Sequence, residues 1–382
     1  MSTKFYLGLL IGAAVALTAA PAAPELSSDS KLFFTGTAGF KYSDNIFLAS
    51  TVQKASSILN VTPGVSLEMG NGALTKNVLS FSQDFISYLN ATDQNTSLAN
   101  LRYDGVFSDA KLSLKLGAGF MQTAQNSRDV RLNGIIAQTD ITNVAPLVEF
   151  ELSTKTSFGA GVIYDSYAYK AAGFTDRTAI TVPLNLWYEV APKLQGSAGY
   201  RYRKNAVDLP GADSIDHYLN VGLRGEFDPK LKGTMSVGFV QRKIDDVTVG
   251  SVHTTGRSES SIGLETKLDY AYSDKTAFNF AAKNDFANAA TGGSQKVFEL
   301  SGGVSSNLDS VLAANVSLSY SNYKYIATTR NDDFYRFEMG VTYSYSSVLK
   351  LNASYNYQRN SSNVAGSSFA GNIYGLSAIL RY

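Results

Sequence analysis

The chain has 382 residues, and its 33 Lys and Arg nearly balance its 32 Asp and Glu. This balance excludes the basic surface typical of nucleic-acid binding, and the absence of Cys excludes disulfides, thiolate metal sites and a lipid anchor on an N-terminal Cys. Charged residues make up 17% of the chain, below the roughly 25% of a soluble domain, whereas Tyr (23) and Phe (21) are abundant.

The N-terminal residues differ in composition from the rest of the chain. Lys4 precedes an apolar stretch from Phe5 to Ala19, and Ala20-Pro21-Ala22 offers an A-x-A cleavage site. This order of a basic residue, a short apolar stretch and small residues is typical of a secretory signal peptide. We therefore expect residues 1–22 to be removed near Ala22 on export, leaving 23–30 as a short N-terminal segment.

From residue 31 to the C-terminus, apolar and polar residues alternate along segments of about 11–14 residues, as in β-strands with one apolar face. In 348–359, Leu, Ala and Tyr occupy one face, and Lys, Asn, Ser and Gln occupy the other. The sequence contains eighteen such segments, at 31–42, 55–69, 77–89, 95–107, 111–122, 142–152, 154–168, 177–190, 192–204, 214–227, 230–243, 256–272, 276–288, 295–307, 311–324, 331–345, 348–359 and 370–382.

The length of these segments separates two fold classes. Strands of soluble sandwiches and solenoids average about 5–6 residues, whereas roughly 9–11 tilted residues span a bilayer. Backbone groups in lipid must all be paired, so spanning strands close into a barrel. Short turns also alternate with longer polar connections, as in outer-membrane barrels. The sequence therefore predicts an all-β, transmembrane, antiparallel up-and-down β-barrel of about eighteen strands over residues 31–382.

The first predicted strand leads into a short motif. Residues 33–50, FFTGTAGFKYSDNIFLAS, contain Tyr42, Asp44, Asn45 and Ile46 as Tyr-x-Asp-Asn followed by an apolar residue. Placed directly after the signal peptide, this motif resembles the opening hairpin of the bacterial family described as putative β-barrel porins of the second type. The resemblance implies an outer-membrane barrel. Some relatives accompany exopolysaccharide operons, which implies polymer export as an alternative role.

The longest external connection, at about 123–141, is the third in the chain. In many porins the third external loop folds inward and narrows the pore. Here Arg128, Asp129 and Arg131 lie beside the apolar Ile135 and Ile136, a composition able to pack against an inner wall. Two interpretations remain open at this point: a constriction loop and an ordinary exposed loop.

Charged residues within the segments fall on the polar face. A Lys or Arg that faced lipid near the midplane would cost about 2–4 kcal/mol, so we expect these residues to line a pore or to form ion pairs that brace the wall. They are Glu68, Arg102, Lys115, Glu189, Arg201, Arg203, Arg224, Glu226, Glu265, Lys267, Lys283, Glu299, Arg336, Glu338, Lys350 and Arg381. A lumen of mixed sign predicts weak ion selectivity. Arg201, Arg203 and Arg224, on neighbouring segments, predict a basic stripe that favours anionic solutes.

Residues for catalysis or metal binding are scarce. The chain has two His, and both His217 and His253 fall at or in polar loops, where a solvated role is favoured over a catalytic one. Asp245-Asp246 and Asp332-Asp333 are better explained as solvated charge than as Ca²⁺ ligands. We therefore expect no catalytic residues, no metal site and no cofactor.

The chain ends within its last predicted strand. Apolar or aromatic residues alternate up to the terminal aromatic, at positions Tyr374, Leu376, Ala378, Leu380 and Tyr382. This ending resembles the C-terminal signature of bacterial outer-membrane proteins, which implies recognition by the barrel assembly machinery. In a closed barrel this strand also pairs with the first one.

At about eighteen strands, side chains alone cannot fill the interior of a barrel, so an aqueous channel is expected. The sequence thus predicts a Gram-negative outer-membrane pore for passive diffusion of small hydrophilic solutes, with outer-membrane lipid, the assembly machinery and solutes as partners. One alternative is the exit channel of an exopolysaccharide export system, with the polymer as its cargo. A second alternative is a structural or adhesive barrel with a blocked lumen. No enzymatic activity is expected, and the sequence does not define an oligomeric interface.

Overall fold

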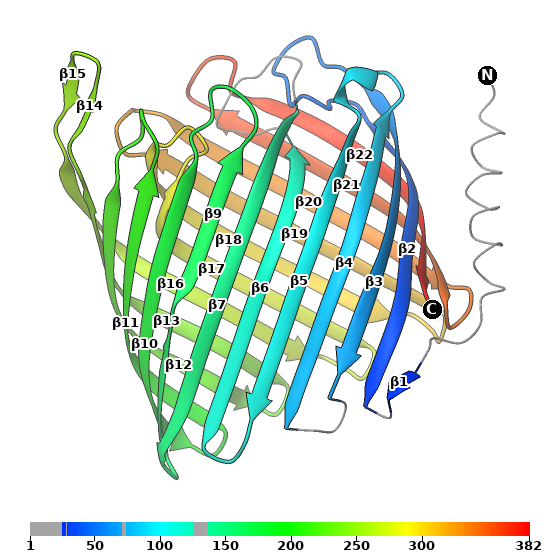
Figure 1. Cartoon of the computed structure of the whole chain (residues 1–382), viewed down its shortest axis with the longest axis vertical. Helices are drawn as coiled ribbons and strands as arrows, with labels where there is room; N and C mark the ends of the chain where they lie inside the picture. Colours follow the sequence, from blue (N-terminus) through cyan, green and yellow to red (C-terminus); the bar gives the residue numbers. More distant parts are fainter. Residues whose placement is uncertain (1–24, 28, 71–73, 126–135) are drawn as a thin grey trace.

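The computed structural model describes residues 25–27, 29–70, 74–125 and 136–382. Within these ranges the chain forms a closed antiparallel barrel of eighteen wall strands, seen from the side in Figure 1. No helix among the described residues is long and apolar enough to cross a membrane. The expected signal peptide, 1–22, lies outside the described residues and stays a prediction.

Each wall strand pairs with its neighbours in chain order. The wall strands are β2 (Ser30–Ser43), β3 (Ser56–Met69), β4 (Thr75–Tyr88), β5 (Thr96–Ser108), β6 (Leu112–Gln125), β7 (Ala137–Ser153), β8 (Thr156–Gly161) with β9 (Ile163–Tyr169), β10 (Arg177–Ala191), β11 (Leu194–Val207), β12 (Ser214–Asp228), β13 (Leu231–Ile244), β16 (Arg257–Ala271), β17 (Thr276–Asn288), β18 (Ser294–Asn307), β19 (Leu312–Tyr325), β20 (Asn331–Ser344), β21 (Leu349–Ser362) and β22 (Phe369–Arg381). Strands β8 and β9 are two halves of one wall position, because both pair with β7 and β10.

Three short strands and one turn of 3₁₀ helix lie outside this wall. Strand β1 (Glu25–Ser27) pairs with the start of β2. Strands β14 (Val247–Val249) and β15 (Val252–Thr254) form a separate hairpin between β13 and β16, beyond the rim in Figure 1. The 3₁₀ turn η1 (Thr92–Gln94) follows β4.

The predicted fold class is confirmed, and each of the eighteen predicted segments overlaps one wall strand. The segment predicted at 276–288 has the same bounds as β17, whereas the segment predicted at 142–152 extends to Ala137–Ser153 in β7. Alternation is a strong signal here because each wall strand has one face toward lipid and one toward the interior.

The barrel closes between its first and last strands. Strand β22 pairs with β2 from Arg381 opposite Thr35 to Ile373 opposite Ser43. Beyond the strand, the backbone N–H and C=O of Tyr382 bond with those of Phe34, at 2.9 and 2.8 Å. These two bonds extend the pairing of the first and last strands by one more residue pair.

The Tyr-x-Asp-Asn motif lies at the other end of this seam. Asp44 accepts hydrogen bonds from the backbone N–H and the side-chain amide of Asn372, at 2.7 and 2.6 Å. Buried Asn45 donates to the carbonyls of Ala370 and Ala49, both at 2.9 Å. The motif therefore ties the first wall strand to the last.

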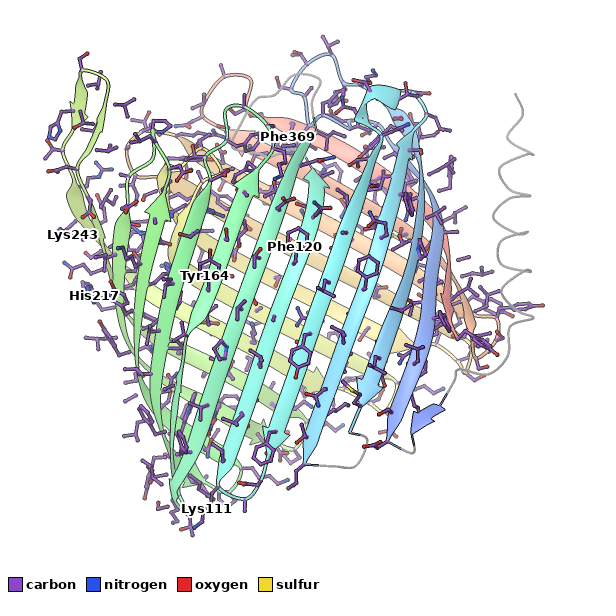
Figure 2. The ribbon with its side chains drawn as sticks, in the orientation of Figure 1. Lys111, Phe120, Tyr164, His217, Lys243 and Phe369 are labelled. Atoms are coloured by element: carbon purple, nitrogen blue, oxygen red, sulfur yellow. The ribbon has the colours of Figure 1, made fainter. Side chains whose placement is uncertain are left out.

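Apolar side chains cover the outer face of the wall. Leu219 on β12, Phe239 on β13 and Ile262 on β16 are all more than half exposed, and cross-strand register places them side by side on this face. Figure 2 shows Phe120 and Tyr164 on the same outer surface. In water such a surface would be costly, but in a bilayer it is the expected lipid contact.

Two of the short turns share one hydrogen-bonding pattern. The carboxylate of Asp109 accepts backbone N–H bonds from Lys111 and Leu112, at 2.8 and 2.7 Å, and Asp309 does the same in its own turn. These backbone donors hold the pKa of both carboxyl groups below the usual value for Asp. Aspartate in this position favours a tight turn because its side chain replaces a backbone acceptor.

Candidate functional site

The tip of the β17–β18 hairpin separates from β16, although β18 stays paired with β19 as far as Gln295. Strand β16 pairs with β13 from Arg257 to Tyr270, but with β17 only from Leu264 to Ala271. Strands β17 and β18 remain paired with each other as far as Asn288 and Ser294. Residues 285–295, here named the inserted hairpin, therefore leave β16 together.

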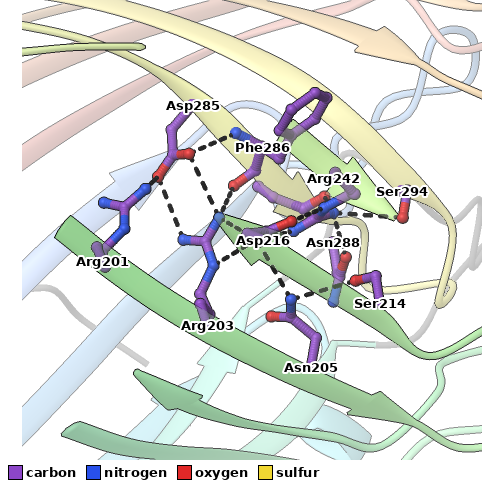
Figure 3. A network of polar contacts seen from close by, with 11 residues as sticks. Arg201, Arg203, Asn205, Ser214, Asp216, Arg242, Asp285, Phe286, Asn288 and Ser294 are labelled. Atoms are coloured by element: carbon purple, nitrogen blue, oxygen red, sulfur yellow. Dashed lines mark hydrogen bonds and ion pairs between the residues drawn. The ribbon is translucent and has the colours of Figure 1, made fainter. Parts of the chain in front are cut away.

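The inserted hairpin bonds to the inner side of strands β10 to β13. Its carbonyls accept hydrogen bonds from Arg203 (at Phe286 O) and Arg242 (at Ala287 O), both at 2.8 Å. The carbonyl of Ala290 accepts the backbone N–H of Thr175, which precedes β10, at 2.9 Å. The hairpin tip thus lies against the inner side of the wall, and Figure 3 shows the side chains of Arg203 and Arg242 reaching toward it.

An apolar contact holds the hairpin against the wall. Phe286 is 1% exposed and packs with Tyr218 of β12 and Val240 of β13. The Tyr218 ring lies over Gly263 of β16, where an added Cβ would be 2.3 Å from the ring. Only glycine leaves room for that ring, so the contact depends on the sequence of three neighbouring strands.

Ion pairs surround this apolar contact. Arg201 and Arg203 of β11 bond to Asp285 at 2.7 and 3.2 Å, and Arg203 also pairs with Asp216 of β12 at 2.6 Å. Arg242 of β13 donates hydrogen bonds to both carboxylate oxygens of Asp216, at 2.6 and 2.8 Å. Neither of these two side chains has any exposed surface. Paired and bonded in this way, buried charges are tolerated, but removing one partner leaves the other uncompensated.

The same arginine connects the wall directly to the hairpin. Arg242 donates a further hydrogen bond to the side-chain oxygen of Asn288, at 2.8 Å. Asn288 is itself buried, and its carbonyl accepts from Arg177 of β10. We name the group of Arg201, Arg203, Asp216, Arg242 and Asp285 the ionic latch, because it joins three wall strands to the hairpin.

A second charged cluster lies elsewhere on the inner wall. Arg224 of β12 bonds to Glu149 of β7 at 2.9 Å and to Gln195 of β11 at 2.7 Å. Its guanidinium stacks 3.7 Å from the ring centre of Trp187 on β10. Side chains from four wall strands thus meet around one arginine.

The predicted basic stripe is therefore wrong. Arg201 lies opposite Tyr218 on β12, six residues from Arg224 and so about 20 Å away at the rise of a β-strand. Arg201 and Arg203 are paired with Asp285, and Arg224 is paired with Glu149. The sequence could not show these pairings, because both acids come from strands distant in the chain.

Beside the inserted hairpin, the interior contains a cavity of about 940 Å³. Its walls come mainly from β2 to β4 and β19 to β22, with Ala290 of the hairpin on one side. Its lining combines amide and hydroxyl side chains with a similar number of apolar ones, together with four charged residues: Lys41, Asp84, Arg336 and Glu338. The cavity is thus of mixed polarity and mixed charge.

Cross-strand register places all sixteen predicted pore residues on the face of the wall opposite the exposed apolar residues. One run, Glu265, Lys283 and Glu299, lies directly opposed on three successive strands. Among the described residues, seven of the sixteen form salt bridges: Glu68, Arg102, Arg201, Arg203, Arg224, Glu226 and Arg381. Ion pairs are therefore observed for these seven residues, and pore lining by all sixteen stays a prediction.

The predicted constriction residues Arg128, Asp129 and Arg131 lie outside the described residues. Ile136, which follows them, packs against a cluster of Ile46, Tyr88 and Ala91 and lines the cavity. The inward element that the structure describes is instead the inserted hairpin. Its sequence from 287 to 294, ANAATGGS, is small and uncharged, but so is the external connection at 363–368, NVAGSS, so this composition does not by itself reveal the hairpin.

The remaining candidate residues bond to the protein's own groups. His217 lies on the outer face, where its Nδ1 is 2.7 Å from the hydroxyl of Tyr200 (Figure 2). Asp332 pairs with Arg330 at 2.6 Å, and Asp333 accepts from Tyr320 at 2.7 Å. Within the described ranges, no group of three or more His, Cys, Asp or Glu is placed to hold a metal ion.

Comparison with known families bears directly on this architecture. Residues 212–382 match the model of the family described as "Putative beta-barrel porin 2". The family resemblance predicted from the sequence is thereby confirmed over that part of the chain. No curated protein sequence matches the chain.

Solved structures share the barrel fold. The FrpB iron transporter from Neisseria meningitidis (F5-1 variant) is 12% identical with a TM-score of 0.50, over 88% of this chain and 62% of that chain. Pseudomonas aeruginosa OpdK, solved with vanillate, is 10% identical with a TM-score of 0.48, over 93% of this chain and 99% of that chain. Pseudomonas aeruginosa OccK5 (OpdH) is 13% identical with a TM-score of 0.47, over 94% and 100%. With its apolar outer face and the family match, the chain is an outer-membrane β-barrel.

Proposed function

We propose that the protein is an outer-membrane pore for passive diffusion of small hydrophilic solutes. The observation that carries this proposal is the combination of a closed barrel with charged residues on its inner face and, inside it, a cavity of about 940 Å³ lined by both polar and apolar side chains. Charged side chains on the inner face avoid the cost of facing lipid. They also give the lumen a polar lining, which water and hydrophilic solutes can pass.

The inserted hairpin limits the size of what passes. Its tip, around Ala290, borders the cavity, and the Ala290 carbonyl accepts the backbone N–H of Thr175, just before β10. A path narrowed in this way favours small solutes over a polymer, so the exopolysaccharide exit channel is the less supported alternative. Because the same hairpin occupies part of the lumen, it is also the observation that favours the other alternative, a barrel with a blocked lumen.

Weak ion selectivity follows from the pairing of the inner charges. The three arginines of the ionic latch face two aspartates, and Arg224 faces Glu149. The charges that line the cavity are two basic and two acidic residues: Lys41, Arg336, Asp84 and Glu338. Because neither sign predominates, cations and anions should permeate at similar rates.

We infer that the protein is not an enzyme. His217 is on the outer face against Tyr200, and His253 contacts the hydroxyl of Thr248 at 3.0 Å on the β14–β15 hairpin. Neither histidine has a neighbouring nucleophile and carboxylate in the arrangement of a catalytic triad among its hydrogen-bond partners in the described residues. This geometry supports transport rather than catalysis.

The expected partners follow from the same surfaces. Outer-membrane lipid contacts the apolar outer face, and small solutes enter the lumen. We further propose that the last strand is read by the barrel assembly machinery. Its alternate residues Tyr374 and Leu376 are more than half exposed on the outer face, available to a partner before the strand is sealed against β2.

The test is electrical and osmotic. Purified protein in planar bilayers should give discrete conductance steps, with a reversal potential close to zero in a salt gradient. Liposomes containing it should swell in small sugars and amino acids but not in large oligosaccharides. No conductance and no swelling would favour the blocked barrel, whereas discrete steps without any swelling would mean a path that passes ions but excludes the solutes tested.

A further inference from the structure

The gap between β16 and β17 leaves backbone groups of β16 without a strand partner. Between Arg257 and Leu264, two backbone carbonyls of β16 accept hydrogen bonds from side chains instead. Lys296 donates to the carbonyl of Ser260 at 3.0 Å, and Asn284 donates to the carbonyl of Ile262. Lys296 also pairs with Glu259 at 3.2 Å. Two polar side chains therefore occupy positions that strand hydrogen bonds would normally fill.

The existing register predicts which residues would fill that edge. Leu264 lies opposite Asn284, so the next pairs in the same ladder would join Gly263 to Asp285, Ile262 to Phe286 and Ser261 to Ala287. Within a ladder each step of one residue on β16 is matched by one step on β17. The hairpin is long enough to supply all of these partners.

The side-chain pattern of β17 fits this extended ladder with β16. Phe278 and Phe280 lie on the outer face of the wall, and Phe286 has the same parity. In the extended ladder Phe286 would lie beside Ile262, facing lipid. Asp285 has the parity of Lys283 and would face the lumen. Alternation therefore continues through residues that the structure holds away from the wall.

We propose that the inserted hairpin is a gate with two positions. In one it is docked inside the barrel by the ionic latch and Phe286, as in the structure. In the other it completes the β16–β17 ladder and widens the lumen. This regulation rests on the proposed pore function.

Each position has contacts that the other lacks. Docking supplies the arginine bonds to the carbonyls of Phe286 and Ala287 and buries Phe286. Completing the β16–β17 ladder supplies backbone hydrogen bonds along the edge of β16 that has no strand partner, and it places Phe286 in lipid. Asp285 is the only acidic residue of the hairpin, so it alone carries the hairpin's charge attraction to Arg201 and Arg203.

The cysteine-free chain allows the zipped position to be trapped. Ser261→Cys with Ala287→Cys joins two residues that are opposed only in the extended ladder. Lys267→Cys with Ala281→Cys is the matched control, because those residues are already opposed in the structure. Both variants are oxidised in membranes, and the disulfide is detected by mass spectrometry of peptides, without reference to conductance.

The expected result is a disulfide in both variants, with a larger conductance on oxidation only for the 261–287 pair, reversed by reductant. Adding Asp285→Asn should increase the fraction of the 261–287 pair that cross-links. A disulfide in the control but none in the test pair, with or without Asp285→Asn, overturns the second position. A 261–287 disulfide without a conductance change, in protein whose wild type conducts, overturns the gate. Wild-type protein without any conductance contradicts the pore function itself.

Discussion

Two parts of the wall are built in different ways. Strands β19, β20 and β21 pair with one another along almost their full lengths, through backbone bonds and alternating side chains. Strands β16 and β17 part after eight residue pairs, and the chain there is held by buried ion pairs and one apolar contact. The first region shows that repetitive pairing is enough to make a wall. The second shows that side chains from several strands can outcompete that pairing locally.

The largest expected effect comes from breaking the latch that distinguishes the second region. Arg242→Ala leaves Asp216 buried with one of its two arginine partners, and breaking a buried pair in this way costs about 3–5 kcal/mol. Urea unfolding of the protein in lipid vesicles should show this loss. Lys193→Ala, which breaks the exposed pair with Glu226, is the control and should cost about 0–1 kcal/mol. Equal losses in the two variants would mean that the latch does not stabilise the barrel.

A smaller effect is expected at the seam, which belongs to the regularly paired region. Asn45→Ala removes the bonds of this buried side chain to Ala49 and Ala370, which lie in part-buried surroundings, at about 1–3 kcal/mol. The loss can be measured as a lowered unfolding midpoint in urea. Asp93→Ala, in the exposed turn after β4, serves as the comparison. An unchanged midpoint for Asn45→Ala would show that the motif is not needed to close the barrel.

A change in selectivity is expected at the second charged cluster. Glu149→Gln keeps the shape of the side chain but leaves the charge of Arg224 uncompensated on the inner wall. The reversal potential in a salt gradient should then shift toward anion selectivity by a few millivolts. Glu151→Gln, on the same strand and without a salt bridge in the described residues, should shift it less. A shift of the reversal potential toward cation selectivity would contradict a conducting path that runs beside Arg224.

The smallest effect concerns the turns. Because the pKa of Asp109 and Asp309 is lowered in the folded state, each carboxylate stabilises the fold above the ordinary Asp pKa of about 3.9. That contribution is lost as the pH falls through the still lower native pKa. The stability difference between wild type and Asp109→Asn should therefore be constant at neutral pH and shrink below about pH 4. Ser346→Ala, in a turn whose hydroxyl does not titrate, should show a difference independent of pH.

The wall could be predicted from the sequence because its cause is local. In 348–359 and 276–288, each residue's face is set by alternation, and the bilayer penalises every exception. The placement of charged residues such as Glu265 and Lys283 on one face follows from the same rule.

The inserted hairpin could not be predicted, because its causes are not local. Its position depends on Arg203 and Arg242, which lie more than forty residues before it in the chain, and on the space over Gly263. Alternation continues through Phe286 and predicts a wall strand, whereas the structure places that residue inside. The basic stripe failed for the same reason, since Asp285 reaches Arg201 from a strand four wall positions away.

The central claim is that the barrel conducts and that the inserted hairpin narrows its path. Replacing residues 288–294 by Asn-Gly keeps the β17–β18 hairpin, since that turn suits two paired strands, but removes the tip that borders the cavity. Single-channel recordings should show conductance steps for the wild type and larger steps for the shortened variant. Steps of equal size, or none from either protein, would contradict the account.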